Sequence, residues 1–89
     1  MASIRRIKKD IDYLIGEVLS DCDTFMFLYP EKKHDEAIAI IVETVDLRNK
    51  LMERARKIEG KPKAHFKAIF EDLLKGVDGM FTRISALTK

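Results

Sequence analysis

The sequence predicts an all-α fold, an antiparallel up-down-up bundle of three helices, on the basis of three observations. Apolar residues recur at alternating intervals of three and four in three segments, which places them on one face of a helix. Breaks containing proline or glycine divide the chain into segments of about 25 residues, or about 38 Å of helix each. No segment alternates apolar and polar residues as a half-buried strand does. Short connections between helices of equal length favour antiparallel packing in a single domain over residues 1–89; the alternative is a long hairpin whose third segment packs against a second chain.

The first predicted helix covers residues 4–29. Ser3 is a candidate N-cap, because its hydroxyl can accept a hydrogen bond from an early backbone N–H. Pro30 ends the helix, since proline disfavours helical geometry at the preceding residue, Tyr29. The apolar residues form two neighbouring rows, the first of Ile4, Ile7, Ile11, Leu14 and Val18 and the second of Ile15, Leu19, Cys22 and Met26.

The second predicted helix covers residues 35–59, after a polar connection at residues 31–34. Asp35 or His34 is the expected N-cap, and Gly60 is expected to end the helix in the left-handed conformation that glycine adopts readily. The residues expected to face the core are Ile38, Ile41, Val42, Val45, Met52 and Ala55, with Leu47, Leu51 and Ile58 beside them.

The third predicted helix covers residues 63–88 and has the most regular pattern. Pro62 suits its first turn, where no backbone N–H is needed. Gly76 and Gly79 lie inside this helix and Gly16 lies inside the first, where each glycine costs about 1 kcal/mol relative to alanine. We expect these glycines to allow close approach between helices. The predicted core residues of the third helix are Phe66, Phe70, Leu73, Val77, Met80, Ile84 and Leu87.

The sequence gives no indication of export or of membrane insertion. No apolar stretch approaches the roughly 18 residues that a membrane-spanning helix needs. Basic residues before an apolar stretch that ends at Cys22 superficially resemble a lipoprotein signal, but Asp10, Asp12 and Glu17 interrupt the stretch and Asp21 precedes the cysteine. A single cysteine forms no disulfide framework, so we predict a cytoplasmic protein in which Cys22 is a buried apolar side chain.

Both ends of the chain resemble those of small, uncharacterised bacterial all-helical proteins. The similarity is carried by the opening segment Ile4-Arg5-Arg6-Ile7-Lys8-Lys9-Asp10-Ile11 and the closing segment Ile84-Ser85-Ala86-Leu87-Thr88-Lys89. It covers most of the chain and implies a bacterial helical domain. The family has no known activity that could be assigned to these residues.

The predicted topology gathers positive charge at one end of the bundle. In an up-down-up arrangement, residues 1–10 lie beside the second connection, residues 54–67. These two segments hold ten basic and two acidic residues, a net charge of +8, which leaves −6 for the rest of a chain whose total is +2. Helix N-termini also favour anions, so this end is a candidate site for nucleic-acid backbone or another polyanion. The candidate residues are Arg5, Arg6, Lys8, Lys9, Arg54, Arg56, Lys57, Lys61, Lys63 and Lys67.

The opposite end is predicted to be apolar. Residues 25–29 and 37–42 are continuous apolar or aromatic runs, and residues 80–87 of the third helix reach the same end. A run longer than one helical turn covers every face of a helix, whereas a bundle buries only a stripe. Some of these side chains should therefore be exposed, as at protein interfaces. The candidate interface residues are Phe25, Phe27, Tyr29, Ile40 and Phe81.

Catalytic, metal and cofactor sites are not predicted. Glu31 and His34 form a single Glu-x-x-His unit in a loop, and Cys22 lies far from both histidines in the helical register. No phosphate-binding glycine loop or zinc-ligand spacing is present. We therefore predict a non-enzymatic protein that associates with a protein partner or a second copy through the apolar end; the alternative is polyanion binding through the basic end.

Overall fold

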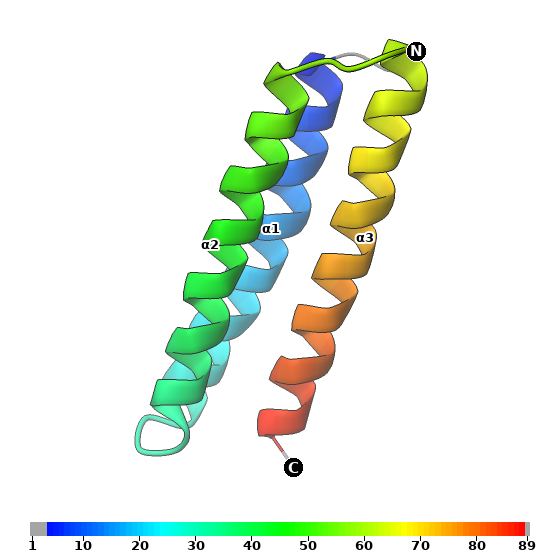
Figure 1. Cartoon of the computed structure of the whole chain (residues 1–89). Coiled ribbons are helices and arrows are strands. Elements are labelled where there is room, and N and C mark those ends of the chain that lie inside the picture. Colours follow the sequence, from blue (N-terminus) through cyan, green and yellow to red (C-terminus); the bar gives the residue numbers. More distant parts are fainter. Residues whose placement is uncertain (1–3, 89) are drawn as a thin grey trace.

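The computed structural model describes residues 4–88 and contains three helices, α1 (Ile4–Leu28), α2 (His34–Arg56) and α3 (Pro62–Leu87). They run up, down and up, so that α1 and α3 are parallel and α2 is antiparallel to both (Figure 1). Each helix packs against the other two in a rod of 48 × 18 × 17 Å. The predicted three-helix bundle is confirmed, and the hairpin with a detached third segment is wrong. No helix within residues 4–88 is long and apolar enough to cross a membrane.

The core runs the length of the rod, and α1 contributes to it from both predicted rows. The exposed Ile4 and half-buried Leu14 lie at the margin of the buried face. That face falls between the two rows because a helix buries a stripe wider than one line of side chains. The buried residues of α1 are Ile7, Ile11, Ile15, Val18, Cys22 and Phe25.

The first half of α2 buries a different face from the one predicted. Ala37, Ile40 and Thr44 point into the core, whereas Ile38 and Val42 are exposed, as is Val45. The Thr44 side chain enters the core without an unsatisfied hydroxyl, because Oγ1 donates a hydrogen bond of 2.6 Å to the carbonyl oxygen of Ile40. In the second half, Leu51, Met52 and Ala55 are buried as expected.

Both ends of α2 differ from the sequence prediction. The N-cap is Lys33, with φ of 54° and no side-chain cap, while Asp35 lies in the first turn, where a carboxylate favours the helix dipole. The helix ends at Arg56, so Gly60 lies in the following loop; it does have the expected positive φ, 69°. Ser3, the proposed cap of α1, lies outside the described residues.

The start of α3 at Pro62 agrees with the prediction. Its core face includes Phe66, Leu73 and Val77 and also Ile69, which the predicted row omits. Phe70, which that row includes, is exposed on the flank of the helix. The buried face of α3 is therefore rotated slightly about the helix axis from the predicted face.

Only one of the three helical glycines allows a close approach. A Cβ atom at Gly76 would lie 2.6 Å from Cδ2 of Leu47, so α2 and α3 come close together there. Gly16 and Gly79 have nothing within 4 Å of the corresponding position. The expected packing role is thus wrong for those two residues.

Three ion pairs join the helices and show which flank of each helix faces which neighbour. Arg48 of α2 binds Asp12 of α1 at 3.0 Å. Arg54 of α2 binds Asp72 of α3, and Glu43 of α2 binds Arg83 of α3, both at 2.7 Å. All six side chains are substantially exposed, so each pair adds little stability.

Candidate interaction surfaces

The predicted apolar end is only partly exposed. Phe27, near the end of α1, is 83% exposed, and Tyr29 is exposed to a lesser degree. Phe25 and Ile40 are buried in the core, which corrects their assignment to an interface. Phe81 is half-buried on the flank of α3. These two residues are buried because α1 turns Phe25 of its apolar run into the core and α2 turns Ala37 and Ile40 of its run into the core.

Exposed apolar side chains remain on α2 and at the end of α1. Ile38, Val42 and Val45 are spaced as neighbours along one side of α2 and are all exposed. They lie on the flank that faces α1, because Arg48, three residues after Val45, binds Asp12 of α1. On α1, Phe27 lies about 60° further around the helix than Asp12 and away from the core, so its side chain projects outward near the start of α2. We call Phe27, Ile38, Val42 and Val45 the apolar patch.

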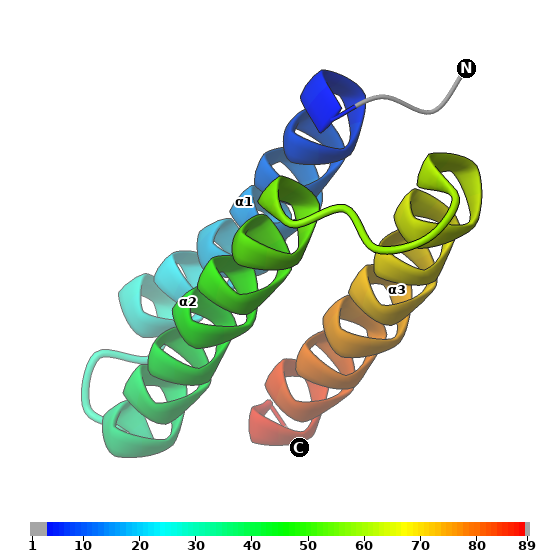
Figure 2. The same cartoon turned by 45° about the horizontal axis from the view of Figure 1, so that its top comes forward.

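The basic end forms as the topology predicts. The start of α1, the end of α2 and the start of α3 lie at the same end of the rod (Figures 1 and 2). Two of the ten candidate residues are held by carboxylates, Arg54 by Asp72 and Lys57 by Glu53. His65 is half-buried at this end, and its Nε2 lies 2.6 Å from the carbonyl oxygen of Arg54.

Most of the remaining cations at this end are available to a ligand. Among the residues that the structure describes, seven of the candidates have no carboxylate within ion-pair distance. Most of these side chains are exposed, and only Lys8 is half-buried. The seven residues are Arg5, Lys8, Lys9, Arg56, Lys61, Lys63 and Lys67.

Two of the side chains considered for catalysis or metal binding, Cys22 and His34, lie in the core or contact the backbone. Burial raises the pKa of the Cys22 thiol, with further contributions from the charges of Asp23 and Asp21. The thiol is therefore held in its protonated, weakly nucleophilic form. His34 makes a contact of 3.2 Å from Nε2 to the carbonyl oxygen of Tyr29. Within residues 4–88, no group of three or more potential ligand side chains could hold a metal ion.

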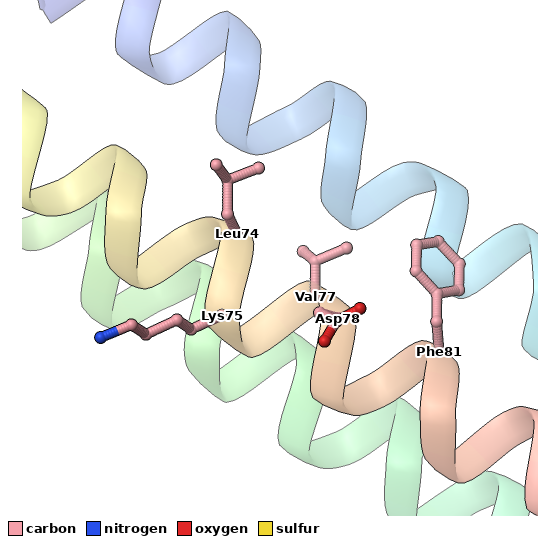
Figure 3. A pocket seen from close by; sticks show the side chains of 5 residues that line it. All are labelled: Leu74, Lys75, Val77, Asp78 and Phe81. Carbon is pink, nitrogen blue, oxygen red and sulfur yellow. The ribbon is translucent and has the colours of Figure 1, made fainter.

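A second apolar surface lies on α3, and Phe81 is the one residue of it that was predicted as an interface residue. A shallow hollow is lined by Leu74, Lys75, Val77, Asp78 and Phe81. Figure 3 shows the three apolar side chains on the side of α3 that faces α1. Phe70, one turn before Leu74, is also exposed. The signal in the sequence was the spacing of Phe70, Leu74 and Phe81, which repeats along one flank beside the core row.

Comparisons with protein-family models, with curated proteins and with solved structures find no match to this chain. The functional interpretation therefore depends on the chemistry of three surfaces. These are the apolar patch, the basic end and the flank of α3 that faces α1.

Proposed function

We propose that this protein is a non-enzymatic cytoplasmic protein that acts by binding another protein through the apolar patch. The observation that carries the proposal is the 83% exposure of Phe27 beside a second helix that exposes Ile38 and Val42. Burying one such side chain contributes about 1.5–3 kcal/mol. Exposed apolar groups that are contiguous, rather than scattered singly, mark interaction sites.

Neighbouring side chains of α1 and α2 are packed against the core, which favours specific binding at the apolar patch. Leu19, Met26 and Ile41 are half-buried and pack against the core. Helical residues that are packed from below lose little conformational entropy when a partner covers them. An aromatic anchor surrounded by aliphatic side chains is also the composition typical of the centre of an interface.

Two isoleucines at opposite ends of the bundle provide a matched test. Ile38 in the apolar patch is 47% exposed, and Ile58 in the α2–α3 loop is 48% exposed. We expect Ile38→Ser and Phe27→Ser to reduce capture of specific proteins from bacterial extract roughly tenfold, because each removes apolar area worth over 1.4 kcal/mol. Ile58→Ser should capture as wild type does. Quantitative mass spectrometry of the captured proteins measures the difference, with nuclease added to remove contacts bridged by nucleic acid. Equal capture by all variants would contradict the proposal.

The unpaired cations at the basic end support a second candidate function, binding of nucleic-acid backbone. Lys61 and Lys32 are both exposed loop lysines at opposite ends of the rod, which makes them a matched pair. In fluorescence anisotropy titrations with mixed-sequence RNA and DNA, we expect salt-sensitive binding that Lys61→Glu weakens roughly tenfold and Lys32→Glu leaves unchanged. Salt-independent binding, or equal loss in both variants, would exclude the basic end as the site.

A further inference from the structure

The flank of α3 that faces α1 carries a continuous row of residues with basic and apolar sections. Lys63, Lys67, Phe70, Leu74 and Phe81 repeat at helical intervals of three, four or seven. This row lies on the opposite side of the helix from Asp72 and Arg83, which bind α2. The apolar section is the one that lines the hollow in Figure 3.

The flank of α1 that faces α3 carries a matching acidic row. Asp10, Leu14, Glu17 and Asp21 repeat at intervals of four and three, on the side of α1 opposite to Asp12, which binds α2. Leu14 is half-buried, whereas Glu17 and Asp21 are exposed. This row and the α3 row lie on the flanks of α1 and α3 that face each other, and together we call them the α1–α3 face.

The charge on the α1–α3 face changes sign along the rod. The helices α1 and α3 are parallel and begin at the same end of the rod (Figure 1). Lys63 and Lys67 therefore lie near that end, whereas Glu17 and Asp21 lie further along, at about the level of the α3 segment between Leu74 and Phe81. None of these four side chains has an ion-pair partner within residues 4–88. Apart from Asp10, the face is thus basic near the start of the two helices and acidic further along, with Phe70 and Leu74 between the lysines and the carboxylates.

We propose that the α1–α3 face binds a second copy of this chain in antiparallel orientation. A two-fold axis that passes between Phe70 and Leu74 turns the lysines of each copy toward Glu17 and Asp21 of the other, and it brings Phe70 and Leu74 of the two copies together. A parallel dimer would align like charges, and a partner helix with one sign of charge would be repelled at one end. Charge complementarity therefore selects the second copy.

The proposal does not depend on the proposed function, because the apolar patch lies on α2 and on the outward side of α1, outside the α1–α3 face, and stays exposed in this dimer. The two surfaces can be tested separately. Phe27→Ser changes only the patch, and charge substitutions at the α1–α3 face leave the patch intact.

Charge reversal tests the arrangement directly. One variant carries Lys63→Glu and Lys67→Glu, and the other carries Glu17→Lys and Asp21→Lys. In sedimentation velocity at high micromolar concentration, we expect the wild type to dimerise and each variant alone to be monomeric. Each substitution acts twice in a two-fold dimer, so the dissociation constant should rise at least roughly tenfold. An equimolar mixture of the two variants should dimerise again, since both ends then pair acidic with basic residues.

The proposed dimer would be contradicted by a wild type that is monomeric at high concentration, by variants that still dimerise alone, or by a mixture that stays monomeric. Circular dichroism checks the fold, which these changes should preserve because all four side chains are exposed and glutamate in the first turn of α3 favours the helix dipole. Phe27→Ser should dimerise as wild type does, and loss of the dimer in that variant would place the contact at the apolar patch instead.

Discussion

Replacing Leu73 by alanine is expected to lower the free energy of unfolding by about 3–5 kcal/mol, the range measured when a buried leucine leaves a cavity. Leu73 is 0% exposed and lies at the middle of α3, a helix that packs against both of the others. A domain of this size has a total stability of roughly 4–13 kcal/mol. The substitution therefore removes a large share of it, and the melting temperature should fall by more than about 10 °C.

The neighbouring residue provides the control for this prediction. Leu74 is 46% exposed, so Leu74→Ala removes the same atoms from the same helix but should cost less than about 1 kcal/mol. Urea unfolding followed by circular dichroism gives both values, and each variant is measured at two protein concentrations because dimerisation would add stability that depends on concentration. Equal losses at the two positions would mean that the core face of α3 is misassigned.

The architecture could be predicted because α1 and α3 combine clear periodicity with clear stops. In α3, apolar residues from Phe66 to Leu87 keep a regular spacing, and Pro62 fixes where the helix begins. Pro30 likewise ends α1 close to the expected residue. Three segments of matching length with short connections leave few alternatives to an antiparallel bundle.

The face of α2 could not be predicted from the same kind of pattern. Residues 37–42 are apolar at every position, so they carry no periodicity that distinguishes inside from outside. The next inward residue is Thr44, whose polarity argued for the surface. Its hydrogen bond to the Ile40 carbonyl makes burial inexpensive, and that bond exists only once the helix has formed. The sequence pattern therefore did not reveal that Ala37, Ile40 and Thr44 form the buried row of α2.

The same ambiguity explains how much of the candidate interaction surfaces could be predicted. The gathering of cations at one end follows from topology alone, and the structure places the corresponding helix ends together. The identity of the exposed apolar residues depends on helix rotation, which is why Phe25 and Ile40 proved to be buried. The α1–α3 face required knowledge of which flanks meet, and that came from the partners of Asp12 and Asp72.

Replacing Gly16 and Gly79 by alanine is expected to raise the free energy of unfolding by about 1 kcal/mol each and by about 2 kcal/mol together. Both residues are in helices, and an added Cβ would meet no atom within 4 Å. Alanine restricts the unfolded chain and favours the helix at no steric cost. The double variant should melt roughly 8–16 °C higher than the wild type, as measured by differential scanning calorimetry.

Gly76 should behave differently, because its packing partner is close. An alanine Cβ would lie 2.6 Å from Cδ2 of Leu47, so the leucine has to move. Leu47 is half-buried and its terminal methyl groups can adjust, so the cost of moving it should cancel most of the gain in helix propensity. We therefore expect Gly76→Ala to change stability by less than about 0.5 kcal/mol. If Gly16→Ala or Gly79→Ala were destabilising instead, those positions would have to be covered by another chain, and the exposed outer faces of α1 and α3 would need to be reassigned as part of an interface.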